Sequence, residues 1–236
     1  LKSVRAKVKG TKVKIRLGAS SGEWKAMVAD KAARTTFAKN IKTVLEKNKL
    51  DGIDLDFEWA ENEKEYKDYS LAILKMREVL GDKYLFSVSL HPVCYKISKE
   101  AIEAVDFISL QCYGPSPVRF PIEKYCSDIQ MVLEYGIPKE KLVAGVPFYG
   151  VTKDNSKKTE AYFNFVQNGL VTSPAQNEVI YQGDTYVFDG QDNIRIKTRY
   201  AKEQKLKGMM SWDLATDLPL SDSRSLLKTM TEELRE

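Results

Sequence analysis

Histidine and cysteine are scarce in this sequence. Among the 236 residues there is one histidine, His91, and there are three cysteines, Cys94, Cys112 and Cys126. One histidine gives little material for a Ser-His-Asp triad or for a metal site built from several imidazoles. An odd number of cysteines without close spacing argues against a disulfide framework and against a zinc knuckle. We therefore expect free thiols, no bound metal and no cofactor.

Long apolar runs and a strong net charge are also missing. No apolar run approaches the ~20 residues that a membrane-spanning helix requires. The net charge of +4 is too small to indicate a nucleic-acid partner. The dense basic segment 2–14 alternates with valine, which is typical of a solvated edge or an exposed face. The first residue is Leu1 and no signal peptide follows it, so we expect the chain to begin inside a longer gene product.

What is present is the composition of a globular protein. Hydrophobic residues make up 43% and charged residues 30% of the chain, as in ordinary folded domains. The length suits one large domain or two small ones.

The segment 51–59 is the most unusual part of the chain. Acids at positions 54, 56 and 58 alternate with apolar residues at 53, 55 and 57, which predicts a β-strand with two different faces. Acids two residues apart on a strand lie about 6.6 Å apart, so they crowd one another. Such a row is either the solvated face of an antiparallel edge, a set of oxygen ligands for a divalent cation, or a purposeful polar site.

Strand patterns and helix patterns alternate along the whole chain. We expect strands at 12–18, 51–58, 84–90, 105–113, 141–150 and 208–213. We expect helices at 30–49, 61–80, 98–104, 122–135, 160–168, 197–206 and 223–234. This order predicts parallel strands with helices outside them. Residues 151–206 break the rhythm, and turn signals at Gly183-Asp184 and Asp189-Gly190 indicate a small antiparallel hairpin there. No glycine-rich phosphate fingerprint follows any strand, which disfavours a nucleotide site.

Polar and aromatic residues gather at the C-terminal ends of the expected strands. These strand ends carry Glu58, His91, Gln111, Tyr113, Tyr149, Trp212 and Asp213. In a β/α barrel the C-terminal rim is where active sites are built, so we expect these residues to form one site.

These motifs resemble glycoside hydrolase family 18, the chitinase family. The acid motif Asp-x-x-Asp-x-Asp-x-Glu is complete, as Asp51, Asp54, Asp56 and Glu58. Further matches are the segments 111–113, 146–150 and 208–212. The resemblance implies an α/β fold of the (β/α)8 TIM-barrel type.

Only six long strands can be counted where a closed barrel needs eight. On the family pattern the segment 12–18 resembles the third strand and the acid strand the fourth. We therefore expect strands one and two to be missing from this chain, either as lost upstream sequence or as a disordered N-terminal part. We interpret residues 1–236 as one catalytic domain, partial at its N-terminus, with residues 151–206 as an irregular insertion that carries the hairpin.

The resemblance also implies roles for individual residues. Glu58 would protonate the leaving oxygen and later deprotonate water. Asp56 would orient the substrate's 2-acetamido group, which replaces the protein nucleophile, and Asp54 would share a proton with Asp56 because close carboxylates resist double ionisation. Tyr113 would hydrogen-bond the acetamido oxygen. Trp212 would form the hydrophobic floor under the sugar, Gln111, Tyr149 and Asp213 would contact it, and Asp51 would brace the start of the strand.

Two departures from the family pattern bear on the substrate. The family's Ser-x-Gly-Gly reads Arg16-Leu17-Gly18-Ala19 here, and its Met-x-Tyr-Asp reads Gln111-Cys112-Tyr113-Gly114. The first expectation is a retaining hydrolase of β-1,4-linked N-acetylglucosamine polymers. An endo-β-N-acetylglucosaminidase acting on N-glycan chitobiose cores is a second possibility, and a catalytically inactive chitinase-like carbohydrate-binding protein is a third.

The expected partner is thus an oligosaccharide or polysaccharide that contains N-acetylglucosamine, with no nucleic acid and no membrane span. We expect a monomer. The resemblance places the protein outside the cytosol, as a secreted, periplasmic or cell-surface protein, because such substrates lie there.

Overall fold

The chain folds into two compact units. The computed structural model describes residues 1–20, 23–114, 120–154 and 158–236. The first unit comprises residues 1–89 and 96–106, and the second comprises residues 90–95 and 107–236.

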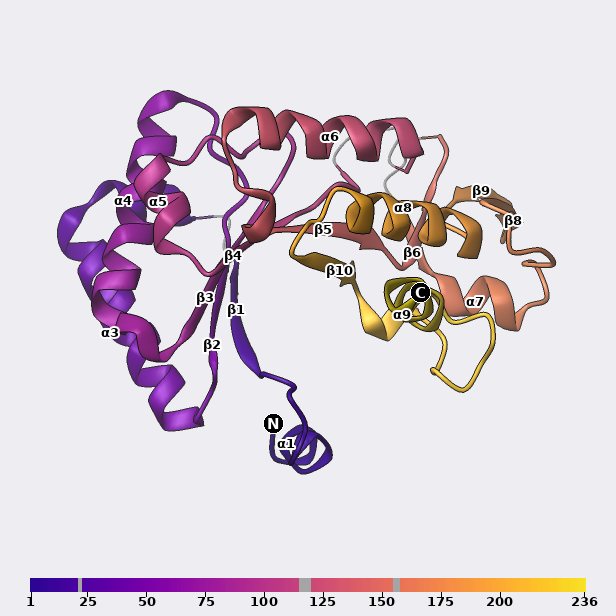
Figure 1. The fold of residues 1–236 in the computed structure, drawn as a ribbon, viewed down its shortest axis with the longest axis horizontal. Coiled ribbons are helices and arrows are strands. Elements are labelled where there is room, and N and C mark those ends of the chain that lie inside the picture. The colour runs from indigo at the N-terminus through magenta and orange to yellow at the C-terminus, as the bar shows by residue number, and fades with distance from the viewer. Residues whose placement is uncertain (21–22, 115–119, 155–157) are drawn as a thin grey trace. The chain divides into compact units, whose positions relative to one another are not determined.

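The first unit is a parallel sheet with helices packed against it (Figure 1). Its strands follow the order β1 (Arg16–Ser20), β2 (Gly52–Asp56) and β3 (Leu85–Leu90). Its helices are α1 (Lys2–Val8), α2 (Trp24–Ala29), α3 (Lys31–Asn48), α4 (Glu63–Leu80), the 3-10 turn η1 (Gly81–Lys83) and α5 (Lys99–Ala104). Helices α3, α4 and α5 lie together on one side of these strands (Figure 1).

The two long helices of this unit, α3 and α4, begin at side-chain caps. Asp30 accepts a hydrogen bond from the backbone N–H of Ala33 at 2.6 Å, which caps α3. Asn62 accepts one from the N–H of Glu65 at 3.0 Å, which caps α4. Each cap satisfies a backbone donor that the first helical turn leaves without a helical partner.

The second unit contains a parallel sheet and a small antiparallel sheet. The parallel strands follow the order β4 (Phe107–Leu110), β5 (Leu142–Pro147) and β10 (Gly208–Trp212). The antiparallel strands follow the order β7 (Thr159–Ala161), β6 (Tyr149–Thr152), β9 (Asp184–Val187) and β8 (Glu178–Tyr181). The helices are α6 (Ile122–Tyr135), α7 (Tyr162–Gln167), α8 (Gln191–Glu203) and α9 (Leu226–Arg235), with 3-10 turns η2 (Lys139–Lys141) and η3 (Leu214–Thr216).

The predicted alternation of strands and helices is confirmed, and the strands within each parallel group run parallel. The hairpin predicted at Gly183-Asp184 is also present, as β8 and β9. Residues 155–157 of the predicted insertion lie outside the described residues, as do residues 21–22 after β1. The closed eight-stranded barrel and the single catalytic domain stay predictions.

Several predicted boundaries were wrong. Of the two expectations for the segment 2–14, the exposed face is confirmed and the strand edge is wrong, because residues 2–8 form α1, a helix with no buried residue. The first strand begins at Arg16 rather than at Lys12. The segment 141–150 is two strands rather than one, because β5 ends at Pro147 and β6 begins a different sheet at Tyr149.

Two helices were also misplaced. Gly190 does not belong to a hairpin but precedes α8, which begins at Gln191, six residues before the predicted start. Helix α2 was not predicted, because its six residues are too few to show a clear helical period. Among the described residues, no helix combines the length and the apolar character needed to cross a membrane.

Candidate active site

The acid-bearing strand β2 has the two faces that its alternation predicts. Ile53, Leu55 and Phe57 are buried. The acids point to the other face, and exposure increases along the strand from Asp54 and Asp56, which are half-buried, to Glu58, which is exposed. The face is therefore neither a fully solvated edge nor a sealed core, and its most accessible acid lies just beyond the C-terminal end of the strand.

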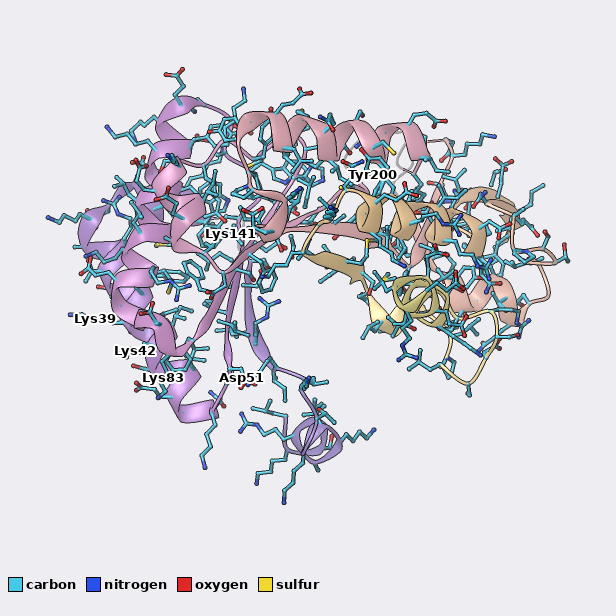
Figure 2. The ribbon with its side chains drawn as sticks, viewed as in Figure 1. Lys39, Lys42, Asp51, Lys83, Lys141 and Tyr200 are labelled. Carbon is cyan, nitrogen blue, oxygen red and sulfur yellow. The ribbon has the colours of Figure 1, made fainter. Side chains whose placement is uncertain are left out.

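Asp51 joins the beginnings of three strands in the first unit. Its carboxylate accepts a hydrogen bond from the N–H of Ile15 at 2.7 Å, and its backbone N–H donates to the Ile15 carbonyl at 2.8 Å. Its own carbonyl accepts from the N–H of Leu85 at 3.0 Å. Figure 2 shows Asp51 at the start of the strands, opposite to the end where Glu58 follows β2. These contacts give Asp51 a structural position.

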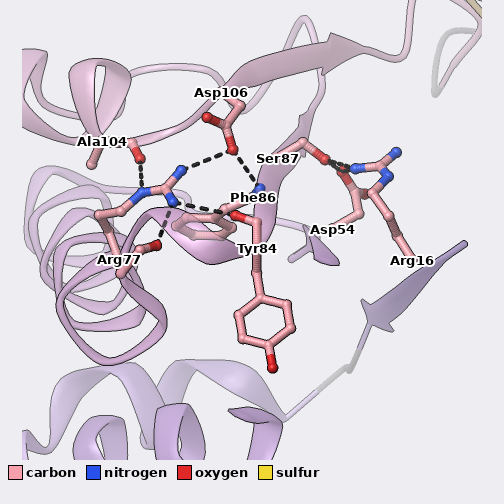
Figure 3. A network of polar contacts seen from close by, with 9 residues as sticks. Arg16, Asp54, Arg77, Tyr84, Phe86, Ser87, Ala104 and Asp106 are labelled. Carbon is pink, nitrogen blue, oxygen red and sulfur yellow. Dashed lines mark hydrogen bonds and ion pairs between the residues drawn. The ribbon is translucent and has the colours of Figure 1, made fainter. Parts of the chain in front are cut away.

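Asp54 is held by side chains from both neighbouring strands (Figure 3). Its Oδ1 accepts a hydrogen bond from the hydroxyl of Ser87, and its Oδ2 accepts one from the hydroxyl of Ser89 at 2.7 Å. Arg16 on β1 donates to the Ser87 hydroxyl and lies 3.7 Å from Asp54 Oδ1. Both carboxylate oxygens thus have partners on β3, and a cation on β1 lies beside them.

Glu58 is anchored through its backbone to the core of the first unit. The indole Nε1 of Trp24 donates a hydrogen bond to the Glu58 carbonyl at 3.2 Å. Trp24 is 1% exposed and stacks on Phe57 with ring centroids 5.3 Å apart. Tyr69 packs against both of these rings. The structure thus places Trp24 in the core beneath the exposed acid.

In the second unit, Gln111 and Tyr113 follow the end of β4. Both are buried, and the Tyr113 hydroxyl donates to Gln111 Oε1 at 3.1 Å. Tyr149 meets Tyr113 edge to face at 6.4 Å and meets Phe120 in the same way at 6.2 Å. Gly145 is required next to this cluster, since a Cβ there would lie 3.1 Å from the Tyr113 ring and 2.6 Å from the Leu110 carbonyl oxygen.

Trp212 ends strand β10 and is 56% exposed. It pairs in register with Pro147 of β5, and its carbonyl accepts from the N–H of Phe148 at 2.8 Å. Trp212 and Tyr149 therefore lie at the same edge of the second unit. Asp213 follows and caps the turn η3 by accepting from the N–H of Ala215 at 2.7 Å.

His91, another of the strand-end residues named from the sequence, is buried. It forms an isolated antiparallel bridge with Cys94. A Cβ on Gly114 would lie 3.5 Å from His91 Nε2, which is ordinary contact distance. The glycine at the position of the family's aspartate is therefore not required by crowding from its described neighbours.

A buried ion pair lies next to Phe120 and Tyr125 in the second unit. Lys197 Nζ is 2.6 Å from Asp189 Oδ2, and both side chains are almost inaccessible. The ammonium also donates to the Phe120 carbonyl at 2.8 Å and lies 5.5 Å from the centroid of the Tyr125 ring. Burial raises the pKa of the Asp189 carboxyl, and the neighbouring Lys197 charge opposes that rise.

The described residues offer no cluster that could hold a metal ion, and the buried Cys112 thiol is protected from ionisation. They contain no group of three or more His, Cys, Asp or Glu side chains that could hold a metal ion. Cys94, Cys112 and Cys126 are free thiols. Burial raises the pKa of the Cys112 thiol to about 12, so this group stays protonated near neutral pH.

The structure brings the predicted residues together in two groups. Asp54, Asp56 and Glu58 share one face of β2, whereas the aromatic and amide residues share an edge of the second unit. Sequence reasoning missed Ser87 and Ser89, whose spacing of two on a predicted strand was the available signal. It also missed Phe120 and the hydrogen bond from Trp24, which no local pattern indicates.

A parallel β/α fold with a row of acids at a strand end is typical of glycoside hydrolases built on β/α barrels. Residues 1–217 match the family model for "Glycosyl hydrolases family 18". The chain therefore belongs to this family.

Similar proteins include both enzymes and a binding protein. "Probable chitinase 2" of Drosophila melanogaster is 23% identical over 261 residues, an alignment that covers 84% of this chain and 54% of that protein. The crystal structure of a chitinase from Bacteroides thetaiotaomicron has a TM-score of 0.86 at 22% identity, covering 98% of this chain and 79% of the other. That of a chitinase-like agglutinin from Robinia pseudoacacia has a TM-score of 0.81 at 20% identity, covering 98% and 83%. At these identities the solved structures show a common fold.

This chain spans about half the length of the Drosophila relative.

Proposed function

We propose that the protein hydrolyses β-1,4 linkages in N-acetylglucosamine polymers or chito-oligosaccharides. The observation that carries the proposal is the complete acid motif on β2, with Glu58 exposed at its C-terminal end and its backbone fixed by Trp24. An exposed acid on a fixed backbone can exchange protons with a bound sugar and with water, as acid–base catalysis requires.

The proposed reaction is retaining and substrate-assisted. The carbonyl oxygen of the 2-acetamido group attacks the anomeric carbon while the glycosidic bond breaks, and Glu58 gives its proton to the leaving oxygen. The product of this step is an oxazolinium ion. Water then attacks the anomeric carbon, and the Glu58 carboxylate takes a proton from that water. The oxazolinium ring opens to restore the acetamido group, and the anomeric carbon keeps its original configuration. Asp56 orients the acetamido group and balances its positive charge.

The residues of the second unit are proposed to bind the sugar. Trp212 presents a large exposed apolar ring, and such rings stack well on the apolar face of a pyranose. The hydroxyl of Tyr113, which donates its one proton to Gln111 Oε1 in the structure, is proposed to donate that proton to the acetamido oxygen instead when the sugar is bound. Tyr149 and Asp213 are proposed as further sugar contacts.

Replacement of Glu58 by Gln tests the catalytic role directly. We expect Glu58→Gln to lower the rate on a fluorogenic chitobioside or chitotrioside by about 10²–10⁴-fold, the usual contribution of a general acid–base. Glu61→Gln is a matched control, because Glu61 is an exposed acid nearby that pairs with Lys25 at 2.9 Å. Equal rates for the wild type and Glu58→Gln would overturn the role of Glu58 as general acid–base and with it the proposed mechanism.

An endo-β-N-acetylglucosaminidase is the second candidate. Gly114 favours it, because the glycine removes a carboxylate that the family pattern places next to Tyr113. A high-mannose glycopeptide and chitin oligosaccharides should be offered in parallel. Cleavage of the glycopeptide alone would replace the first proposal by the second.

A carbohydrate-binding protein without activity is the third candidate, and the agglutinin of the same fold supports it. The intact Glu58 favours catalysis over this alternative. Tight binding of chitotriose by isothermal calorimetry, combined with no hydrolysis by the wild type, would establish it.

Substrate assistance makes its own prediction about inhibition. A thiazoline analogue of the oxazolinium ion should inhibit hydrolysis competitively, and lack of inhibition at saturating analogue would exclude this mechanism.

The closed eight-stranded barrel is part of the proposal, supported by the parallel strands described. The proposed location outside the cytosol follows from the substrate.

A further inference from the structure

Three aromatic residues of the second unit pack against one another in a row. The ring of Tyr149 meets the ring of Tyr113 at 6.4 Å and the ring of Phe120 at 6.2 Å, and both contacts are edge to face. Phe120 and Tyr113 are buried, whereas Tyr149 is half-buried. The two buried neighbours therefore fix the plane of the Tyr149 ring, and the part of that ring that stays accessible can meet a ligand.

Phe120 is itself held through its backbone. It lies just before α6, which begins at Ile122, and its carbonyl accepts a hydrogen bond from the Lys197 ammonium at 2.8 Å. Lys197 belongs to α8, which lies beside α6 (Figure 1). The ammonium therefore joins α8 to the residue that packs on Tyr149.

The ammonium is held in turn by an acid in a fixed position. Asp189 Oδ2 accepts from Lys197 Nζ at 2.6 Å. The backbone next to Asp189 is closely packed, because the N–H of Gly190 donates to Asn177 Oδ1 at 2.8 Å. A Cβ on Gly190 would lie 2.2 Å from the Gln176 carbonyl oxygen, so the two chain segments touch there. The carboxylate thus gives the lysine a rigid support.

Stability alone does not explain why this ion pair is buried. The side chains of Lys197 and Asp189 are 1% and 0% exposed, and well-packed apolar residues in such a place are often at least as stabilising as a buried ion pair. An ammonium adds direction, because its N–H groups point at acceptors, here the Asp189 carboxylate and the Phe120 carbonyl. An apolar side chain could fill the same space without fixing Phe120.

We propose that Lys197 is a positioning residue for sugar binding by the second unit. Held by Asp189, its ammonium fixes Phe120, and Phe120 orients the ring of Tyr149. Lys197 itself meets no sugar, since it is 1% exposed. The kinetic consequence rests on the proposed function, in which Tyr149 contacts the sugar. The orientation of the Tyr149 ring by Phe120 does not depend on that function.

Two variants remove the contact with Tyr149 in different ways. The double variant Lys197→Met/Asp189→Leu removes the hydrogen bond to Phe120 and leaves neither buried charge alone. Phe120→Leu keeps the ion pair and removes the ring that meets Tyr149. Lys197→Met alone is a third variant, which also removes the bond to the Phe120 carbonyl.

Arg199→Gln is the control for loss of stability. Arg199 also lies on α8, and it pairs at 2.8 Å with Glu233 of α9, whose side chain is 6% exposed. The substitution leaves this buried acid without its guanidinium, so we expect Arg199→Gln to unfold at a lower urea concentration than the wild type. It leaves the hydrogen bond between Lys197 and Phe120 in place.

NMR of the ligand-free protein tests the positioning. Tyrosine rings labelled with ¹³C report their packing through the ring currents of their neighbours, and Tyr149→Phe identifies the Tyr149 signal. We expect this signal to move in the double variant, in Lys197→Met and in Phe120→Leu, and to stay in place in Arg199→Gln. Circular dichroism checks that each variant is folded. A folded Lys197 variant whose Tyr149 signal equals that of the wild type would overturn the proposal.

Kinetics with a fluorogenic chitobioside test the consequence for sugar binding. A contact made by Tyr149 acts in the ground state and in the transition state alike, so its loss raises KM more than it lowers kcat. We expect the double variant and Phe120→Leu to raise KM about threefold to tenfold, which corresponds to one aromatic contact. The value of kcat should change less than about twofold, because Tyr113 keeps its own hydrogen bond to Gln111. Arg199→Gln should match the wild type.

The two measurements separate the inference from the proposed function. An unchanged KM in the double variant, together with a displaced Tyr149 signal, would refute the role of Lys197 in sugar binding. If the wild type does not hydrolyse the chitobioside, the proposed function fails, while the Tyr149 signal still decides whether Lys197 positions the ring.

Discussion

The buried pair of Lys197 and Asp189 should behave as one unit in the stability of the protein. The two side chains are 1% and 0% exposed, and their charged atoms are 2.6 Å apart. The ammonium has a second acceptor in the Phe120 carbonyl at 2.8 Å. The carboxylate has a second donor in Asn193 at 3.2 Å. Each charged group therefore has two polar partners. Substitution of one member of the pair removes the oppositely charged partner of the other.

The magnitudes follow from what each substitution leaves behind. Lys197→Met leaves a buried carboxylate without its cation, and Asp189→Leu leaves a buried ammonium without its anion, so each should lower the free energy of unfolding by about 3–5 kcal/mol. The double variant leaves neither charge. It loses the hydrogen bond to Phe120, which costs about 1–3 kcal/mol because the carbonyl stays unsatisfied. The double variant should thus be more stable than either single variant.

The pH dependence of the free energy of unfolding gives a second, independent test of the pair. Burial raises the pKa of Asp189, and removal of Lys197 removes the charge that opposes this rise. A carboxyl whose folded pKa lies above its unfolded pKa binds a proton more tightly in the folded state. Its stability contribution is therefore fully present below the unfolded pKa and is lost as the pH rises through the folded pKa. The deficit of Lys197→Met should grow with pH above about 4, by at most about 1.4 kcal/mol per unit.

Urea denaturation of the wild type, both single variants and the double variant at two pH values gives all of these quantities. The exposed pair of Lys153 and Glu178, whose side chains are 62% and 49% exposed at 2.7 Å, is the matched control. Its double-mutant cycle should give about 0–1 kcal/mol. A Lys197→Met variant that loses less than about 1 kcal/mol, or a double variant that loses the sum of the two single losses, would refute the reasoning.

Two further predictions concern backbone crowding and thiol chemistry. Gly52→Ala should destabilise the protein by about 3 kcal/mol or more, because its Cβ would lie 1.9 Å from the Leu85 carbonyl oxygen, whereas Gly18→Ala meets nothing within 4 Å and should be neutral in urea denaturation. Iodoacetamide at pH 8 should alkylate half-buried Cys126 before buried Cys112, whose pKa is about 12, and peptide mass spectrometry that shows the reverse order would contradict the buried placement of Cys112.

The parts of the fold that the sequence predicts are those with a local period. Strand β2 could be placed within two residues because its acids and apolar residues alternate, and α3 because its apolar residues repeat at helical spacing. Helix α1 has no apolar face to bury, so only its backbone reveals it. The break at Phe148 was missed although Pro147 precedes it, because the run from β5 into β6 is almost entirely apolar and was interpreted as one strand.

The candidate site was predictable only where a motif names its residues. Asp54, Asp56 and Glu58 follow from the motif, but the partners of Asp54 lie more than 30 residues away from it in the sequence, on neighbouring strands. No local pattern shows which of the many charged side chains will meet an acid across a sheet. The cis peptide bonds at Glu58–Trp59 and Trp212–Asp213 likewise have no signature in residue type.

Arg16 shows why a departure from a family pattern needs the structure for its interpretation. Read along the sequence, an arginine at a serine position could be a surface substitution, a lost sugar contact or a new charge in the site. The register of β1, β2 and β3 selects among these readings, since it places the guanidinium beside Asp54 and Ser87. The positive charge of Arg16 is compensated at this position, because the carboxylate of Asp54 lies 3.7 Å from its guanidinium. The acid row and the departure are therefore one electrostatic arrangement, and a change to either should be judged by its effect on the other.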